Sequence, residues 1–370
     1  MAKVALFISS LEGGGAERVM VTLANQFAEQ GHQVDFLLRN KIGVYLSEVS
    51  TKVNLIDLRK ARMVQCFVPL VHYLRTECPV GILSSLPYPN MLNILAARLV
   101  RTKASVVVRE ANTPSMRVRS ALPPKDRIIE RLSTKLCYPY ADWVVAVSRG
   151  VQRDLYHTTR VPRERIVLIY NPSYTARLLQ LRDQPVDHPW FAPGQPPVVL
   201  GVGRFYPHKG FATLLKAFAL VRANRPARLV LLGEGPLRAE LETLAHQLGI
   251  ADQVSMPGFV ENPFAYMRRA AVFVLPSEYE GLPNVLIQAM ACGCPVVSTN
   301  CPSGPEDILD NGKYGHLVPV GDVQAMADAI LRVLNGDAPL VPEEWLWQFH
   351  EERVAKQYLQ LLLNHTQGRI

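Results

Sequence analysis

Short apolar runs alternate with amphipathic helical patterns along almost the whole chain, and this alternation constrains the fold most strongly. Residues 4–8 form a continuous apolar run, typical of a strand buried on both faces. Apolar residues at helical spacing follow from Ala16 to Phe27, and Gly31 predicts the end of that helix. Such βα units predict a mainly parallel sheet. Further strands are expected at residues 34–38, 80–83, 105–108, 143–147 and 166–169.

A proline-rich stretch at residues 171–197 interrupts the alternation and predicts a linker or surface excursion. A second βα series follows it. We therefore expect two similar α/β domains, residues 1–170 and 171–342, with a cleft between them. An amphipathic stretch at residues 343–363 could cap either domain. The strands of the second series are expected at residues 198–202, 229–232, 254–256, 272–275, 296–298 and 317–318.

Composition is typical of a soluble globular enzyme. The 370 residues are enough for two cores, and 48% hydrophobic with 19% charged residues argues against disorder. The apolar runs are too short to span a bilayer, and the N-terminus lacks a signal-peptide pattern, so a cytoplasmic location is expected. The six cysteines form no CxxC pair and are expected to be buried free thiols.

Positive charge is concentrated in the first half of the chain. Residues 1–170 hold 24 Lys and Arg against 13 Asp and Glu, a balance of +11; residues 171–370 hold 16 against 19, a balance of −3. The first half is therefore expected to meet an anionic partner, either nucleic acid or a membrane surface. Residues 116–135 are basic and amphipathic, a pattern that suits anionic lipid and equally suits an ordinary surface helix.

The turn after the strand at 272–275 carries Glu280, Gly281 and Pro283 and leads into an apolar helix. A carboxylate then lies beside a helix N-terminus, where backbone N–H groups and the helix dipole favour an anion. A ligand with both hydroxyls and phosphates, such as a sugar nucleotide, suits this arrangement.

Two cations bracket the turn after the strand at 198–202. Arg204 and Lys209 follow Gly203 at the carboxyl end of that strand, where ligands of open α/β sheets bind. Together they suit a diphosphate, since charge-assisted contacts stabilise it as a leaving group. The alternative is a pair of solvated surface charges, but the neighbouring motifs favour phosphate binding.

Three further turns lie at strand-to-helix junctions. Residues 13–15 are three glycines before the first helix, where N–H groups can bind an oxygen or phosphate; a purely structural turn is the alternative. Gly233 and Glu234 form a second turn, and Phe259 with Val260 a third, in which the aromatic ring could border a base. Alone each is ordinary turn chemistry; on one rim they predict a pocket.

These motifs resemble those of the retaining glycosyltransferase family 4, and the motifs at 303–305 and 317–319 also fit members that build bacterial surface polysaccharides. The resemblance implies an α/β GT-B fold, in which two Rossmann-like βαβ domains face a central cleft. It places the donor nucleotide on the C-terminal domain and the acceptor on the N-terminal domain. The motifs that carry it are Gly203-Arg204, Lys209-Gly210, residues 233–236, 280–283, 289–293, 303–305 and 317–319, with residues 13–18, 147–148 and 171–172 in the first half.

The resemblance implies a role for each matching residue. Arg204 and Lys209 would hold the diphosphate and help the nucleotide depart, and Glu280 would contact the transferred sugar. The loop at Gly14 and Gly15 would close on the donor from the opposite domain. Attack on the same face, without a protein nucleophile, would retain the anomeric configuration. The other expected donor-binding residues are Gly203, Gly233, Glu234, Phe259, Val260, Gly281, Leu282, Pro283, Asn284, Val285, Leu286 and Gln288.

The expected reaction moves a hexose or N-acetylhexosamine from a nucleotide-diphospho-sugar, with a UDP-sugar favoured, to a lipid-linked or growing surface glycan. The chain has no Asp-x-Asp motif, the usual acidic clamp for a divalent cation. Metal-independent transfer without a cofactor is therefore predicted, with Arg204 and Lys209 in place of the ion. Peripheral, salt-sensitive attachment to the inner face of the cytoplasmic membrane is expected, and no nucleic-acid partner.

Two positions depart from the family pattern. Gln288 replaces a common glutamate that reaches the ribose hydroxyls, so a weaker, uncharged contact is expected. Near the end of the strand at 105–108, Arg109 and Glu110 occupy the region where many relatives have a histidine. Glu110 could accept a proton from the acceptor hydroxyl, or it could be half of a structural ion pair.

Two other classes of protein fit parts of the sequence. An NAD-dependent oxidoreductase would suit the βα repeats, but the GxGxxG spacing and an acidic residue for the ribose are both missing. A non-catalytic protein that binds nucleotide-sugars or RNA is suggested by Gln288 and the basic first half. However, no aromatic-rich RNA-binding signature accompanies those charges.

Overall fold

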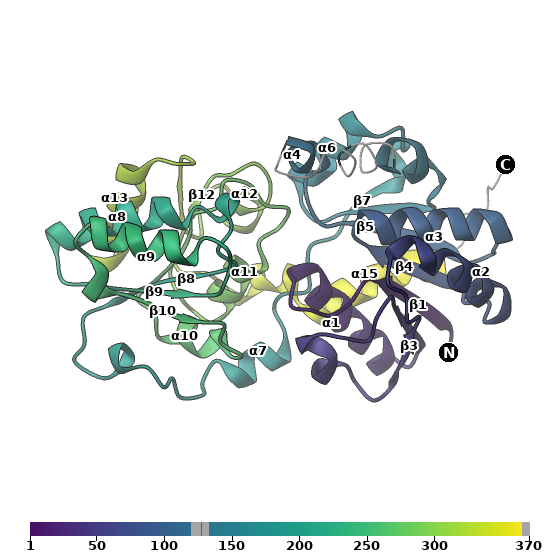
Figure 1. The fold of residues 1–370 in the computed structure, drawn as a ribbon, viewed down its shortest axis with the longest axis horizontal. Coiled ribbons are helices and arrows are strands. Elements are labelled where there is room, and N and C mark those ends of the chain that lie inside the picture. Colours follow the sequence, from purple (N-terminus) through teal and green to yellow (C-terminus); the bar gives the residue numbers. More distant parts are fainter. Residues whose placement is uncertain (120–126, 128–132, 365–370) are drawn as a thin grey trace. The chain divides into compact units, whose positions relative to one another are not determined.

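The computed structural model describes residues 1–119, 127 and 133–364 of the 370-residue chain (Figure 1). The chain divides into two compact α/β units. The first comprises Met1–Pro172 and Phe349–Ile370, and the second comprises Ser173–Gln348. Within the described residues, no helix is long and apolar enough to cross a membrane.

The first unit is built on a seven-stranded sheet in the order β3-β2-β1-β4-β5-β6-β7, and every neighbouring pair is parallel. All strands predicted for this half are present. The prediction missed β3, an edge strand in which only Val53 is buried, so it lacks a continuous apolar run. The strands are β1 (Lys3–Ile8), β2 (Gln33–Leu38), β3 (Val53–Asp57), β4 (Gly81–Ser85), β5 (Ser105–Glu110), β6 (Trp143–Ala146) and β7 (Ile166–Leu168).

Helices cover both faces of this sheet. Helix α1 connects β1 to β2, whereas α2 leads from the edge strand β3 back to β4 beyond β1, and α3 leads on from β4 to β5. With right-handed crossovers, these opposite directions put α1 on one face of the sheet and α2 and α3 on the other. Helix α15 joins α1, because Phe27 of α1 and Tyr358 of α15 belong to one buried apolar cluster. The described helices of this unit are α1 (Gly15–Glu29), α2 (Phe67–Thr76), α3 (Pro87–Val100), α4 (Pro114–Arg119), α6 (Arg149–Thr158) and α15 (Glu351–Leu363).

The second unit has a six-stranded parallel sheet in the order β10-β9-β8-β11-β12-β13. All six strands were predicted, because each contains apolar residues in a short segment bounded by turn residues. The strands are β8 (Val198–Val202), β9 (Arg228–Leu232), β10 (Val254–Gly258), β11 (Val272–Leu275), β12 (Val296–Thr299) and β13 (His316–Val318).

The core of the second unit lies between this sheet and α8, α9 and α13. Phe211, Phe218 and Ile330 are among its buried residues, at apolar positions of helices that alternate with the strands. The helices are α7 (Ala176–Leu181), α8 (Phe211–Asn224), α9 (Arg238–Gln247), α10 (Pro263–Arg269), α11 (Asn284–Ala291), α12 (Pro305–Ile308), α13 (Val323–Leu334) and α14 (Glu343–Leu346).

The C-terminal stretch, predicted as one amphipathic segment at 343–363, is divided between the units. Helix α14 belongs to the second unit, where the Trp345 indole donates to the carbonyl of Ile308 at 2.8 Å. The chain enters the first unit at Phe349, whose ring lies 5.2 Å from that of Tyr170. Helix α15 then buries Val354, Tyr358 and Leu362 in the first unit.

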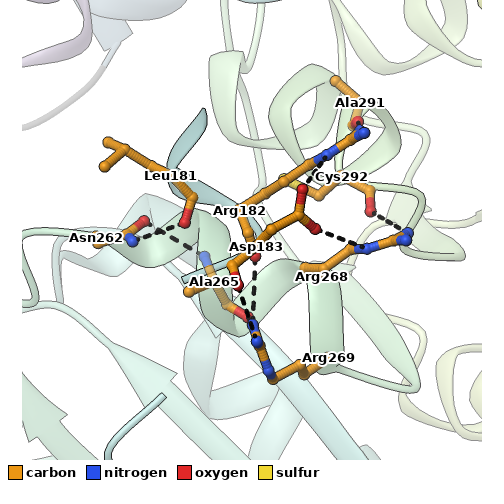
Figure 2. Close-up of polar contacts among 9 residues, drawn as sticks. All are labelled: Leu181, Arg182, Asp183, Asn262, Ala265, Arg268, Arg269, Ala291 and Cys292. Carbon is orange, nitrogen blue, oxygen red and sulfur yellow. Dashed lines mark hydrogen bonds and ion pairs between the residues drawn. The ribbon is translucent and has the colours of Figure 1, made fainter. Parts of the chain in front are cut away.

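Residues 171–197 were predicted as a linker or surface excursion, and from Ser173 onward they belong to the second unit. Figure 2 shows that the arginines at the end of α10 make polar contacts with the residues that follow α7. Arg269 donates to the carbonyl of Arg182 at 3.3 Å, and Asn262 donates to the carbonyl of Leu181 at 2.9 Å. Arg182 in turn donates to the carbonyl of Ala291 at the end of α11, at 2.8 Å. Prolines limit the backbone of this stretch without preventing its side chains and carbonyls from anchoring it.

The cysteines are mostly as expected. Cys66, Cys292, Cys294 and Cys301 are buried free thiols, and Cys137 is half-buried. The prediction was wrong for Cys78, which is exposed. It follows α2 in the turn before β4, where no core residue covers it.

Candidate active site

The carboxyl ends of β8 and β11 bring together two motifs that are far apart in sequence. The strands are parallel neighbours, so the turns that follow them meet at one edge of the sheet. Lys209, in the short helix η7 (Pro207–Lys209), lies with its Nζ 2.6 Å from Oε1 of Glu280. Both side chains are largely buried, 19% and 11% exposed. The structure therefore unites two of the predicted catalytic residues.

Glu280 is held by a second contact. The hydroxyl of Ser277 donates to Oε1 of Glu280 at 2.8 Å, and Ser277 is completely buried. The carbonyl of Ser277 accepts a hydrogen bond from the hydroxyl of Thr299 at the end of β12. A carboxylate with a lysine and a serine hydroxyl on one oxygen has a defined orientation. Ser277 was not among the predicted site residues, although its place three residues before Glu280 in the turn was the available signal.

The two turns are also linked through the backbone. The N–H of Glu278 donates to the carbonyl of His208 at 2.8 Å, and the His208 and Tyr279 rings are stacked with centroids 4.9 Å apart. Burial, and then the charge of Lys209, lower the pKa of His208 from its ordinary value. Gly210 has a left-handed backbone, and a β-carbon there would overlap the carbonyl of Pro276. Only glycine permits this close approach of the two turns.

Arg204 differs from Lys209 in its surroundings. Its side chain is exposed, and the guanidinium lies over the Tyr206 ring, 5.2 Å from the centroid. The predicted pair of cations thus consists of one lysine already paired with a carboxylate and one arginine at the surface of the same turn. Either charge can meet an incoming diphosphate, but the lysine must share or leave Glu280 to do so.

The turns after β9 and β10 complete this rim. The N–H of Phe205 donates to the carbonyl of Glu234 at 2.9 Å, and the N–H of Gly233 donates to the carbonyl of Gly258 at 2.9 Å. At Gly233, with φ of +142°, a β-carbon would overlap the carbonyl of Gly203. Backbone contacts therefore tie three glycine turns into one edge.

The predicted base-binding side chains lie on this edge. Phe259 is 60% exposed and Val260 is half-buried, so the aromatic ring is open to a planar ligand. Glu234 is already paired with Arg238, whose guanidinium also donates to the carbonyl of Met256 at 2.6 Å. Arg238 therefore links Glu234 of the second turn to strand β10.

The N-terminus of α11 follows Glu280 directly. The helix begins at Asn284 after Pro283, and the carbonyl of Gly281 accepts from the hydroxyl of Ser303 at 3.0 Å. Leu282 and Leu286 are buried and anchor this turn, whereas Val285 is half-buried. Their expected contribution to a ligand is therefore through backbone groups.

Two polar side chains follow on α11. Asn284 accepts a hydrogen bond from the hydroxyl of Ser173 at 3.0 Å. Gln288, one turn further along the helix, is 8% exposed. The residue that departs from the family pattern thus lies in a mostly buried position.

In the first unit, Arg109 and Glu110 end β5 and are each 1% exposed. The Tyr138 hydroxyl donates to Oε2 of Glu110 at 2.7 Å. Arg109 donates to the hydroxyl of Ser85 at 3.0 Å and to Oδ1 of Asn171 at 2.6 Å, and burial lowers the pKa of Arg109. Arg109 thereby ties the end of β5 to the last residues before the chain leaves this unit. Glu110 and Tyr138 form a buried pair whose part in catalysis stays a prediction.

The glycine turn of the first unit precedes α1. Gly14 is the residue before that helix, and the Tyr45 hydroxyl donates to the carbonyl of Gly13 at 3.2 Å. The carboxylate of Glu17 folds over the turn, so a β-carbon at Gly14 would overlap it. Gly15 opens α1 itself. The closing of this turn on a donor remains a prediction.

Within the described residues, no group of three or more His, Cys, Asp or Glu side chains could hold a metal ion. The candidate site brings together the cations Arg204 and Lys209, the carboxylate of Glu280, hydroxyls and backbone groups. Such a site can bind an anion beside a polyhydroxylated group.

Comparison with known families agrees with this geometry. Residues 13–177 match Glycosyltransferase Family 4, and residues 196–336 match the family described as Glycosyl transferases group 1. The chain belongs to the family 4 glycosyltransferases. The matched segments together contain all the candidate site residues, and an oxidoreductase is no longer an alternative.

The relatives of this glycosyltransferase include bacterial enzymes of glycan assembly. It is 29% identical over 348 residues, 91% of each chain, to an N-acetylgalactosamine-N,N'-diacetylbacillosaminyl-diphospho-undecaprenol 4-alpha-N-acetylgalactosaminyltransferase of Campylobacter jejuni. It is 28% identical to the lipopolysaccharide core biosynthesis glycosyltransferase LpsE of Rhizobium meliloti, across 94% of this chain and 96% of that one. Among solved structures, Anabaena HepE in complex with UDP-glucose superposes with a TM-score of 0.79 at 18% identity, over 98% and 99% of the two chains. The predicted GT-B fold, with two Rossmann-like domains, is confirmed.

Proposed function

We propose that this glycosyltransferase moves a hexose or N-acetylhexosamine from a nucleotide-diphospho-sugar, with UDP as the favoured nucleotide, to a lipid-linked or growing bacterial surface glycan. The observation that carries the donor assignment is the contact of Lys209 with Glu280 at the edge of the second sheet. A diphosphate needs the cation, and a sugar hydroxyl needs the carboxylate. Their adjacency suits a ligand in which phosphate and sugar are joined.

The cations act on the leaving group. Lys209 and Arg204 neutralise the negative charge that develops on the departing diphosphate, which is the electrostatic stabilisation a metal ion would otherwise supply. Glu280, oriented by Ser277, accepts a hydrogen bond from a hydroxyl of the transferred sugar. The N-terminus of α11 adds backbone donors beside the phosphate-bearing end. We therefore infer transfer that requires no metal.

Retention is proposed through attack on the face that the diphosphate leaves. The acceptor oxygen forms the new bond to the anomeric carbon as the bond to the phosphate oxygen breaks. The acceptor proton passes to the departing phosphate oxygen, so no protein nucleophile is needed. The Campylobacter relative is named for an alpha linkage, which a retaining enzyme forms from an alpha-configured donor. Glu110 is the alternative proton acceptor.

The acceptor is proposed from the relatives. The Campylobacter enzyme's name specifies a diphospho-undecaprenol-linked acceptor, and the Rhizobium enzyme's name specifies lipopolysaccharide core. An acceptor held in a membrane requires the enzyme to work at that surface, and we propose peripheral contact with the inner face of the cytoplasmic membrane. The predicted contact segment, residues 116–135, falls largely outside the described residues, of which it includes only 116–119, 127 and 133–135.

A thermal-shift screen tests the donor assignment. The protein is heated with UDP, GDP, ADP and their common sugars in excess chelator. A nucleotide at about 100 times its Kd stabilises the fold by about 2.7 kcal/mol, which gives a clear shift in Tm. Stabilisation by one nucleotide family, lost in Lys209→Met, supports the proposal. If no nucleotide and no nucleotide-sugar raises the Tm, the donor assignment is contradicted.

A further inference from the structure

A row of aromatic rings connects the turn after β8 to the turn after β11. The Arg204 guanidinium lies over the Tyr206 ring, and the centroids of the Tyr206 and His208 rings are 6.3 Å apart. The His208 ring is in turn stacked on Tyr279, with an interplanar angle of 24°. The row therefore leads from the surface arginine of the first turn to the residue that precedes Glu280 in the second.

The imidazole of His208 is fixed within this row. The carbonyl of His208 accepts the backbone N–H of Glu278, and the ring is half-buried against Tyr279. Lys209 follows His208 directly in η7, and its Nζ contacts Glu280. The imidazole is therefore held beside the groups that are proposed to bind the diphosphate and the sugar of the donor.

The charges around His208 are those of the donor site. Burial, the largest effect, and the charge of Lys209 hold the pKa of His208 below its ordinary value of 6.5. Glu280 raises this pKa, and Arg204 lowers it. At neutral pH the ring therefore carries no charge. The charged or titratable groups that face it include, from its own turn, Arg204, Tyr206 and Lys209 and, from the turn after β11, Tyr279 and Glu280.

A bound diphosphate would reverse this balance. Its negative charge neutralises the cations that disfavour a proton on His208, and it draws Lys209 away from Glu280, whose charge is then less compensated. A protonated imidazole also suits its neighbour, because the face of the Tyr279 ring attracts a cation. The imidazole can therefore change its charge with the ligand at a pH where lysine and arginine stay protonated.

We propose that His208 takes up a proton from solvent when the diphosphate of a nucleotide-sugar binds, and that the resulting imidazolium adds a further positive charge beside the leaving group. The inference rests on the proposed function, since it assumes a diphosphate at Lys209 and Arg204. The proton stays on the ring nitrogen, and no other bond forms or breaks. Donor binding is therefore tighter in mildly acidic than in alkaline solution, and one side chain carries the difference.

The test is isothermal titration of the full chain with UDP-glucose and with UDP-N-acetylgalactosamine, at about pH 6 and about pH 8, in buffers of different ionisation enthalpy. These ligands have no terminal phosphate and do not titrate in this range, whereas the terminal phosphate of free UDP has its second ionisation at about pH 6. The dependence of the binding enthalpy on the buffer gives the number of protons taken up.

Wild type is expected to take up a substantial part of about one proton per ligand in the acidic buffers and almost none in the alkaline ones. Its Kd should be several-fold lower in the acidic buffers. His208→Phe keeps a ring on Tyr279 but binds no proton, so it should abolish both the uptake and the pH dependence of the Kd. In the alkaline buffers its Kd should match that of wild type, because the wild-type imidazole is neutral there.

His208→Asn repeats the test with a smaller side chain, and His246→Asn is its matched control. His246 is an exposed histidine in the last turn of α9, in the same unit. The control should take up protons on binding as wild type does, and equal thermal unfolding in the alkaline buffers shows that each variant is folded. Equal proton uptake in wild type and in both His208 variants would overturn the proposal, since His208 would then only pack the two turns together.

An assay of sugar transfer separates this inference from the proposed function. If a nucleotide-sugar binds with proton uptake through His208 but no sugar is transferred to an acceptor, the proposed function fails and the inference stands. If sugar is transferred but the uptake does not depend on His208, the inference fails alone. If neither nucleotide-sugar binds at either pH, the assumed diphosphate site is wrong and the inference fails with it.

Discussion

Nζ of Lys209 lies 2.6 Å from Oε1 of Glu280, across 71 residues of sequence. The parallel pairing of β8 with β11 makes this contact possible, since each residue follows one of these strands. The two charges neutralise each other in a largely buried place. A bound diphosphate would draw Lys209 toward itself, and Glu280 would then be open to a sugar hydroxyl.

Loss of the lysine charge should affect the reaction more than the fold. Lys209→Met is expected to lower kcat by about 10²–10³-fold, the cost of removing one preorganised group from a developing anion. Lys216→Met, an exposed lysine of the neighbouring helix α8, is the control and should transfer sugar normally. Steady-state kinetics with a UDP-sugar measures both. Equal rates in the two variants would remove Lys209 from the mechanism.

Ser277 is expected to act as a positioning residue for Glu280. Ser277→Ala leaves Glu280 with one fewer donor and should lower kcat about tenfold, since a hydrogen bond to a charged group is lost. The Kd for UDP should stay nearly constant, because UDP lacks the sugar that Glu280 contacts. Steady-state kinetics measures the change in kcat, and calorimetry on the same variant measures the Kd for UDP.

Ser298→Ala is the matched control for Ser277→Ala. Ser298 is also completely buried, but its hydroxyl donates to the carbonyl of Thr299 and not to Glu280. In a Glu280→Gln background, Ser277→Ala should have little further effect on kcat, because the two side chains act through one contact. Full additivity of the two substitutions would show that Ser277 acts only on the fold.

The sequence-based predictions succeeded where physical signals were local. Strands β8, β9 and β11 are largely buried apolar runs, and Lys209 and Glu280 lie in turns whose meeting follows from strand adjacency. Strand β3 was missed because an edge strand needs no continuous apolar run. The stacking of His208 on Tyr279 could not be predicted, since it depends on how two turns bend toward each other.

The proline-rich stretch shows a second limit. Its prolines predict a break in the βα pattern, and the break is present. Its anchoring was not predictable, because Arg269 and Asn262 reach carbonyl groups of Arg182 and Leu181, which have no signature in the sequence. Side-chain to backbone contacts of this kind depend on tertiary packing.

Gln288→Glu should strengthen nucleotide binding. A carboxylate accepts a ribose hydroxyl more strongly than an amide oxygen does, so the Kd for UDP is expected to fall about fivefold, a gain on the order of 1 kcal/mol. Isothermal titration calorimetry of wild type and the variant measures it. Unchanged or weaker UDP binding in the variant would show that position 288 does not meet the ribose.

Acid should weaken the second unit through His188. Its Nδ1 accepts from the backbone N–H of Trp190 at 3.2 Å, its Nε2 lies 3.0 Å from the Ser255 hydroxyl, and burial lowers the pKa of His188 from its ordinary value of 6.5. Between the lowered pKa and 6.5, His188 therefore binds a proton in the unfolded chain but not in the folded chain. Stability is fully present above pH 6.5 and is lost as the pH falls from there toward the lowered pKa.

The measurement for His188 is urea unfolding at pH values from about 5 to 8, with His188→Gln beside wild type. The variant should be less stable than wild type near neutrality, and the difference should shrink as the pH falls. A constant difference in the free energy of unfolding across this range would show that the pKa of His188 is the same in the folded and the unfolded chain.

Metal-independent transfer from a nucleotide-diphospho-sugar is the central claim, and one assay addresses it directly. A UDP-sugar and an undecaprenyl-diphosphate-linked glycan acceptor are incubated with the enzyme in excess EDTA, and release of UDP and extension of the glycan are followed together. We predict that both proceed at the same rate with and without EDTA, and that Lys209→Met lowers both. Complete loss of transfer in EDTA, restored by magnesium, would contradict the account.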